Sequence, residues 1–150
     1  MSSESNSNST GFLRKDVTLD ELNALSANTL VEHLGIKFSH IGPNYVSALM
    51  PVDNRTHQPL GLLHGGASVA LAETLGSIAA TLCVDPKSQY CVGLEINANH
   101  VRAISSGFVK GTASPLHIGK RTHVWEIKIV NEKEELISIS RITMAVIDRR

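Results

Sequence analysis

The strongest hydrophobic pattern in the chain runs from Gly65 to Val84, where apolar and small residues recur on all sides of a 3.6-residue helical repeat. Glu73 is the single charged side chain in this stretch. A helix that is apolar nearly all round is a buried helix, so the pattern predicts one long central helix. Val69, Ala72 and Gly76 lie beside Glu73 on its small-residue face and leave space next to the carboxylate. Because burying an unpaired carboxylate is costly, we interpret Glu73 as a functional residue beside a space that a substrate could enter.

Two other interpretations of this stretch remain open at this point. A lysine or arginine from elsewhere in the chain could pair with Glu73 and make it a structural residue. Residues 62–84 are also long enough to cross a bilayer, which needs roughly 20 residues. The presence of His64 and Glu73 and the richness in glycine and alanine argue against a membrane span.

Shorter patterns precede the central helix. Thr18 and Glu21 have the spacing of a capping box, and leucines follow at helical intervals, which predicts an amphipathic helix over residues 18–27. A second short helix is expected over residues 29–33 and should end at Gly35. We expect both helices to serve packing, although a short helix near a pocket can also line it.

Alternating polar and apolar residues predict about six strands. The expected ranges are 36–41, 45–50, 90–101, 107–114, 121–130 and 136–147, with turns over 42–44, 103–106, 115–120 and 131–134. Hairpin-like connections dominate, so the predicted class is α+β, an antiparallel sheet with its helices segregated from it. One sheet around one helix leaves sheet edges and an apolar face uncovered, which favours a homo-oligomer whose sheets join.

The loop over residues 51–63 leads into His64-Gly65-Gly66 at the start of the central helix. A helix N-terminus has free backbone N–H groups and carries positive partial charge. Two glycines leave these groups open to an approaching oxygen, so a carbonyl that becomes an oxyanion could be held there. The glycines could equally serve only to make a tight turn into the helix, and both roles are compatible.

Composition narrows the function classes. The chain of 150 residues has the length of one domain, and its 14 basic and 14 acidic residues argue against a nucleic-acid-binding surface. Its two cysteines, Cys83 and Cys91, make no disulfide framework and favour a reducing cytoplasm. Residues 1–16 are expected to form a disordered polar tail without the features of a signal peptide, and residues 17–150 a single domain.

Three segments carry a resemblance to a known family. They are Gln58-Pro59-Leu60-Gly61-Leu62-Leu63-His64-Gly65-Gly66-Ala67, Glu73-Thr74-Leu75-Gly76-Ser77 and Gly93-Leu94-Glu95-Ile96-Asn97-Ala98-Asn99-His100-Val101-Arg102. Together they resemble the hotdog-fold acyl-CoA thioesterases, over about residues 17–147. Within that family the likeness is greatest to the bacterial 1,4-dihydroxy-2-naphthoyl-CoA thioesterases of menaquinone and phylloquinone synthesis. The enterobactin proofreading thioesterases and the hydroxybenzoyl-CoA thioesterases are related groups.

The resemblance implies a curved antiparallel sheet wrapped around one long helix, in homodimers and often homotetramers. Glu73 matches the catalytic carboxylate, which acts as nucleophile or as general base. The backbone amide of Gly65 matches the group that polarises the thioester carbonyl, and His64 and Gln58 match residues that position the carbonyl, the thiolate or water. Further matches are the hydroxyls of Thr74 and Ser77. In the family Gln58, His64 and Gly65 come from one subunit and Glu73 from the other.

The resemblance also implies a binding path for coenzyme A, which is part of the substrate, so no separate cofactor is expected. The matching residues along pantetheine and the phosphates are Gly93, His100, Val101, Arg102 and Ala103. On the nucleotide side they are His117, Ile118, Gly119, Lys120, Arg121 and Thr122. Arg102, Lys120 and Arg121 can offer charge-assisted contacts to the phosphates, although an ordinary solvated basic cluster would have the same composition.

Other functions compete with hydrolysis of an aromatic acyl-CoA. The substrate could be an aryl or acyl carrier protein or a medium-chain acyl-CoA. A hotdog dehydratase or hydratase is disfavoured because His-Gly-Gly leads directly into the helix that carries the acid. A non-catalytic acyl-CoA binding module would be expected to lack Glu73. The seven histidines form no His-Glu-x-x-His motif and the two cysteines form no Cys-x-x-Cys motif, so no metal site is expected. The sequence also has no Gly-x-Ser-x-Gly motif, so no serine triad is expected.

Overall fold

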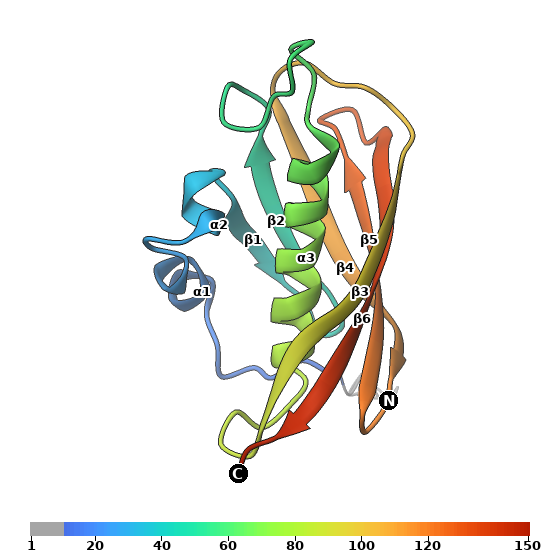
Figure 1. The fold of residues 1–150 in the computed structure, drawn as a ribbon. Helices are drawn as coiled ribbons and strands as arrows, with labels where there is room; N and C mark the ends of the chain where they lie inside the picture. The colour runs from blue at the N-terminus through green and yellow to red at the C-terminus, as the bar shows by residue number, and fades with distance from the viewer. Residues whose placement is uncertain (1–10) are drawn as a thin grey trace, which may run out of the picture.

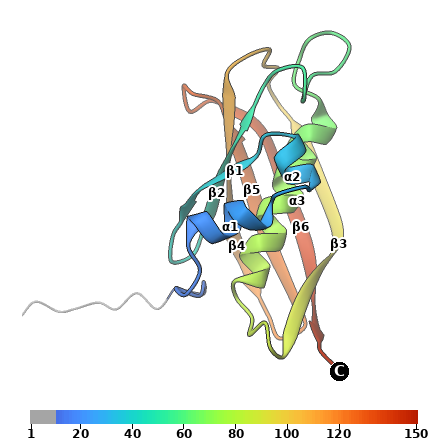
Figure 2. The ribbon, with the colours of Figure 1, turned by 90° about the vertical axis from the view of Figure 1, so that its left-hand side faces the viewer.

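A computed structural model describes residues 11–150 of the protein, in which six strands form one antiparallel sheet. The strand order is β1-β2-β4-β5-β6-β3. The strands are β1 (Lys37–Ile41), β2 (Val46–Pro51), β3 (Gln89–His100), β4 (Phe108–Ile118), β5 (Thr122–Val130) and β6 (Leu136–Asp148). The sheet curves strongly around one long helix (Figures 1 and 2). The expected α+β hotdog fold is therefore confirmed.

The long helix α3 (Gly65–Thr81) runs along the concave face of the sheet (Figure 1). Its side toward the sheet is buried, through Ala67, Ser68, Leu71, Ala72, Leu75, Gly76, Ala79 and Ala80. Gly76 permits the close approach, because a Cβ there would lie 2.5 Å from Cγ2 of Ile142 on β6. The opposite side of α3 is only half-buried, Glu73 included. The helix is thus less enclosed than its composition predicts, because that side is only partly covered by the rest of residues 11–150.

Two short helices, α1 (Leu19–Leu25) and α2 (Leu30–His33), precede the sheet. The predicted capping box is present: Thr18 N–H donates to Glu21 at 2.8 Å, and Glu21 N–H donates to the Thr18 hydroxyl at 3.2 Å. Residues 11–16 belonged to the expected disordered tail, but they pack on the domain. Leu13 is buried because its apolar side chain joins the core, and Arg14 N–H donates to the Leu82 carbonyl at 2.8 Å. Residues 1–10 lie outside the described part.

One predicted turn is wrong. The sequence predicted a turn over residues 115–120, but β4 continues to Ile118 and the chain reverses at Gly119 and Lys120. The register with β5 shifts between Pro115 and His117, so an irregularity in the ladder accommodates the proline instead of ending the strand. His117 and Ile118 therefore belong to a strand rather than to a loop.

The two edges of the sheet differ in length. β1 has five residues, whereas β3 at the other edge has twelve and pairs only with β6. Tyr90, Val92 and Leu94 on β3 are exposed apolar side chains. A long, apolar edge with unpaired backbone groups is a template for pairing with another strand. This edge is the place in residues 11–150 where the joining of sheets expected from the sequence could occur.

Candidate active site

The first turn of α3 holds a free backbone donor. His64 is the N-cap residue, and its Nδ1 accepts a hydrogen bond from Gly66 N–H at 2.7 Å. The next two amides, of Ala67 and Ser68, donate to the His64 carbonyl. Gly65 N–H has no hydrogen-bond partner among residues 11–150. It therefore remains available, at the positive end of the helix, for an oxygen of a ligand.

Two imidazole rings flank this turn. A Cβ on Gly66 would lie 2.9 Å from the ring of His64, and a Cβ on Gly65 would lie 2.8 Å from Nε2 of His100. Both glycines thus leave room for a histidine ring as well as for a ligand. Because Nδ1 of His64 accepts a backbone N–H, this ring carries its proton on Nε2 and can donate from there.

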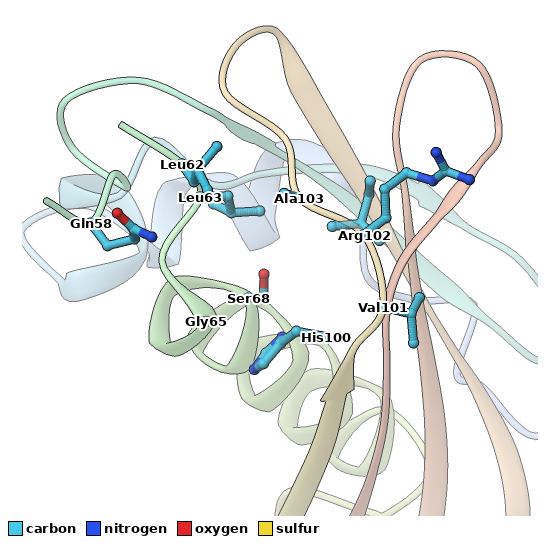
Figure 3. Close-up of a pocket in the computed structure, with 10 residues that line it drawn as sticks. Gln58, Leu62, Leu63, Gly65, Ser68, His100, Val101, Arg102 and Ala103 are labelled. Carbon is cyan, nitrogen blue, oxygen red and sulfur yellow. The ribbon is translucent and has the colours of Figure 1, made fainter. Parts of the chain in front are cut away.

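A cavity of about 270 Å³ opens beside the same turn. It is lined by Gln58, Leu62, Leu63, Gly65, Ser68, His100, Val101, Arg102, Ala103 and Ile137 (Figure 3). Six of these residues were predicted from the sequence, as catalytic or coenzyme A-binding positions. The structure therefore brings Gln58 and Gly65, from the loop and the helix, together with residues at the end of β3.

Sequence reasoning missed Ser68 in this cavity. Ser68 is 2% exposed, and its hydroxyl points from α3 into the space between Leu63 and Ala103 (Figure 3). It follows Gly65 by three residues and so shares its side of the helix. That spacing could have identified Ser68, but a serine among alanines and valine was taken as part of the apolar helix.

The loop before α3 is held in place by the segment after β3. His57 Nε2 contacts the Ser105 carbonyl oxygen at 2.8 Å, and Leu63 N–H donates to the Ile104 carbonyl at 2.8 Å. Within the loop, the Gln58 side-chain oxygen accepts a hydrogen bond from Leu60 N–H. Because the oxygen is used in this bond, the NH₂ group of the Gln58 side chain is the part that can donate a hydrogen bond to a ligand.

Glu73 is not at this cavity. It lies eight residues after Gly65, which is about 12 Å along a helix that rises 1.5 Å per residue. Its carboxylate instead lies against the backbone of β3, where a Cβ on Gly93 would be 2.5 Å from Oε1. One chain therefore holds the predicted carboxylate and the predicted carbonyl-binding amide at separate places.

Thr74 and Ser77 lie on the half-buried side of α3 with Glu73. The Thr74 hydroxyl donates to the Ala70 carbonyl at 2.7 Å, so it can only accept a hydrogen bond from a ligand. Ser77 is one turn from Glu73, and its hydroxyl has no hydrogen-bond partner within the described residues. Of these two hydroxyls, Ser77 is the one that could donate to a ligand or to the carboxylate.

Apart from Gly93, which lies against Glu73 within β3, the residues predicted for coenzyme A fall mainly toward the two ends of the molecule. Gly119, Lys120 and Arg121 line a second cavity, of about 330 Å³, beside Cys83 at the C-terminal end of α3. This end lies opposite the 101–107 segment, at the bottom of Figure 1. Burial, and to a lesser degree the charge of His117, lowers the pKa of His123 in this cavity, so the cations there at neutral pH are Lys120 and Arg121.

The predicted phosphate-binding arginines already have partners. Arg102 contacts Glu135 at 3.2 Å, and its side chain points away from Gly65 (Figure 3). Arg121 lies 3.6 Å from Asp148. Both pairs are exposed, where ion pairs are weak, so a phosphate group could exchange for the carboxylate. Lys120 forms no ion pair with any residue from 11 to 150.

Neither a membrane span nor a metal site is evident in the described part of the chain. From Gly11 to the C-terminus, no helix combines the length and the apolar character needed to cross a bilayer. Over the same residues, no group of three His, Cys, Asp or Glu side chains is arranged to hold a metal ion.

Comparison with known proteins agrees with this architecture. The family model of the thioesterase superfamily matches residues 60–138. The chain is 52% identical over 134 residues to the 1,4-dihydroxy-2-naphthoyl-CoA hydrolase of Escherichia coli, covering 89% of this chain and 98% of that one. It is 52% identical over 133 residues to a proofreading thioesterase of Cronobacter turicensis, covering 89% and 96%. A mutant thioesterase from Pseudomonas aeruginosa superposes with a TM-score of 0.90 at 48% identity, over 92% of this chain and 99% of that one. The chain therefore belongs to the thioesterase superfamily, and it is a thioester hydrolase built on the hotdog fold.

Proposed function

We propose that the protein hydrolyses an aromatic acyl-CoA thioester, of the 1,4-dihydroxy-2-naphthoyl-CoA type, at a site shared by two subunits. The observation that carries the shared site is the separation of Glu73 from Gly65 N–H, about 12 Å along one rigid helix. A carbonyl carbon and its oxygen are about 1.2 Å apart. Glu73 therefore cannot act on the carbon of a thioester whose oxygen is bound by Gly65 N–H of the same chain. The two groups must therefore come from different chains to act on one thioester.

The long edge strand supports such an arrangement. The Glu73 carboxylate lies against Gly93 of β3, and Gly65 lies next to the ring of His100 at the end of the same strand. The two catalytic groups of one chain are therefore near different positions along β3. Antiparallel pairing of β3 with a second copy, about a two-fold axis near Ile96, places the Gly93 region of one subunit against the His100 region of the other. Glu73 of one chain then approaches Gly65 of its partner. The same rotation brings the Lys120 end of one chain toward the first cavity of the other.

In this site the thioester oxygen is bound by Gly65 N–H at the helix N-terminus, which stabilises the negative charge that develops there. Glu73 of the other subunit either attacks the carbonyl carbon and forms an anhydride, which water then hydrolyses to the free acid, or removes a proton from a water molecule that attacks the carbonyl carbon directly. His64 donates from Nε2 to the carbonyl or to the departing thiolate, and the Gln58 amide orients the reacting groups. Coenzyme A leaves as the thiol, and no other cofactor takes part.

The acyl class is tested by steady-state hydrolysis with detection of free thiol. We expect kcat/KM to be highest for 1,4-dihydroxy-2-naphthoyl-CoA, lower for benzoyl-CoA and lowest for hexanoyl-CoA. Glu73→Gln should lower kcat by about 10³-fold or more while substrate still binds. Equal rates for the aliphatic and aromatic substrates would reject the proposed acyl class, and an active Glu73→Gln variant would reject the proposed chemistry.

The shared site is tested by mixing two inactive variants. Glu73→Gln and His64→Ala subunits are combined by unfolding and refolding, with each variant refolded alone as the control. If the two residues act across subunits, half of the dimers are mixed, and each mixed dimer has one intact site. We then expect about a quarter of the wild-type activity. Both residues acting within one chain would give no recovery at all.

A carrier-protein thioester is the second candidate substrate. Sequence identity does not separate the two candidates, because the chain is 52% identical both to the Escherichia coli hydrolase and to the Cronobacter proofreading thioesterase. The two substrates share the acyl group and the pantetheine arm, and they differ in the group attached beyond the phosphate, a nucleotide in one and a protein in the other. Comparing one aryl group on coenzyme A and on an aryl carrier protein separates the two candidates directly.

A further inference from the structure

A buried serine faces His100 from the neighbouring strand. Ser138 on β6 pairs in register with His100, the last residue of β3. Its Oγ lies 3.3 Å from Nδ1 of His100. Ser138 is 1% exposed, whereas His100 is exposed at the mouth of the cavity. The other ring nitrogen of His100, Nε2, is the atom closest to where a Cβ on Gly65 would lie, at 2.8 Å.

The burial of Ser138 decides which group donates. Nδ1 of His100 is the one hydrogen-bond partner of the Ser138 hydroxyl among the residues that the structure describes. If Nδ1 donated to Oγ, the hydroxyl proton would point into the core without an acceptor, which is costly for a buried polar group. The hydroxyl therefore donates to Nδ1. His100 then carries its ring proton on Nε2, the side that faces Gly65.

We propose that Ser138 is a positioning residue for His100, and that Nε2–H of His100 donates a second hydrogen bond to the thioester carbonyl oxygen beside Gly65 N–H. The inference rests on the proposed function, because it assumes that the carbonyl oxygen binds at Gly65. It gives the oxygen two donors, one from the helix and one from the sheet. Two fixed donors stabilise a developing oxyanion more than one, since neither must reorient when the charge forms.

His64 holds a different position from His100 at this turn. Its Nδ1 holds Gly66 N–H, and its ring lies against Gly66 rather than Gly65. The two histidines therefore approach the turn from different sides. Each has a different group fixing its proton on Nε2: a backbone amide for His64 and the Ser138 hydroxyl for His100.

A set of four variants tests the positioning role. Ser138→Ala should lower kcat about 2- to 10-fold with little change in KM, the effect of one hydrogen bond. His100→Ala should lower kcat by about 10²-fold. The double variant should match His100→Ala alone, because Ser138 acts only through His100. Ser140→Ala is the matched control: it removes a hydroxyl that is 4% exposed, two residues along the same strand and without a partner within residues 11–150, and should leave kcat unchanged.

The ring proton is observed directly by two-bond ¹H–¹⁵N correlation spectra of protein labelled in its histidines. We expect His100 to be the Nε2–H form in the wild type and a mixture of both forms in Ser138→Ala. A Nδ1–H form in the wild type, or normal turnover in Ser138→Ala, would overturn the inference. An equal further loss when Ser138→Ala is added to His100→Ala would also overturn it. Failure of the proposed function would be distinguishable, because the wild type itself would then release no thiol from acyl-CoA while the spectra still report the Ser138–His100 pair.

Discussion

Gly93→Ala offers the sharpest test of the place of Glu73 in catalysis. A Cβ at residue 93 would lie 2.5 Å from Oε1 of Glu73, whereas ordinary van der Waals contact begins at 3.4 Å. The carboxylate must therefore move by about 0.9 Å, and a misplacement of about 1 Å at a reacting group can cost about 10²-fold in rate. We expect kcat to fall by about 100-fold, which corresponds to about 2.7 kcal/mol of activation free energy.

The same change should barely affect folding. The atom in the way is the end of a flexible, half-buried side chain, and Gly93 does not need a positive φ. We expect the free energy of unfolding to change by less than about 0.5 kcal/mol. The assay combines steady-state kcat on an acyl-CoA, urea unfolding and the molecular mass in solution, because Gly93 lies on the exposed edge strand.

Gly111→Ala is the matched control with the opposite expectation. A Cβ there would lie 2.6 Å from Cδ1 of Leu75 and 3.2 Å from Cδ2 of Leu71, and both leucines are fully buried. Overpacking of this kind costs about 1–3 kcal/mol of stability, with no direct effect on Glu73. Wild-type kcat in Gly93→Ala, with an unchanged dimer, would refute the reasoning that the position of this carboxylate limits the rate.

Three further predictions concern other parts of the chain. Thr18→Ala removes the N-cap of α1 and should lower the free energy of unfolding by about 1 kcal/mol in urea titrations; an unchanged midpoint would contradict this role. The side-chain and backbone hydrogen bonds from Arg55 lower the pKa of Asp53 to about 2. The stabilisation from this ion pair is therefore fully present above pH 3.8, the usual pKa, and is lost as the pH falls through about 2. In Arg55→Ala, which keeps the backbone hydrogen bond, the carboxyl resonance of Asp53 should titrate nearer 3.8, and a midpoint still near 2 would exclude the Arg55 side chain as the main cause. Burial, and then Cys91, raises the pKa of the Cys83 thiol to about 12, so its alkylation followed by mass spectrometry should still accelerate above pH 10 rather than level off near pH 9.

The elements were predictable where local chemistry decides them. The capping box of Thr18 and Glu21, the start of α3 at His64-Gly65-Gly66 and the six strands all follow from residue spacing, and all are present. The extension of β4 past Pro115 was not predicted, because a proline ends a strand by local rules. Here the ladder with β5 continues beyond an irregularity, so pairing with a neighbouring strand prevails over local preference.

The residues of the first cavity were predictable only in part. Gln58, Gly65 and His100 were identified by their resemblance to a family, whereas Leu62, Ser68 and the Ser138 contact behind His100 were not. These residues have no distinctive local pattern. Ile137 and Ser138 come from β6, far along the chain from the helix whose first turn they approach, and only the sheet brings them there.

The sequence by itself determined the presence of a long helix with a single carboxylate and a glycine-flanked histidine at its start, because spacing and composition act over a few residues. Only the tertiary structure decided that Glu73 and Gly65 point to different places along β3, that the coenzyme A residues lie mainly toward two ends, and that one side of α3 is only partly covered. These are distances between segments that are remote in sequence, and they depend on how the sheet curves around the helix. The strand order leaves β3 as a long edge that pairs only with β6 among the described residues, and the proposed shared site lies along this edge.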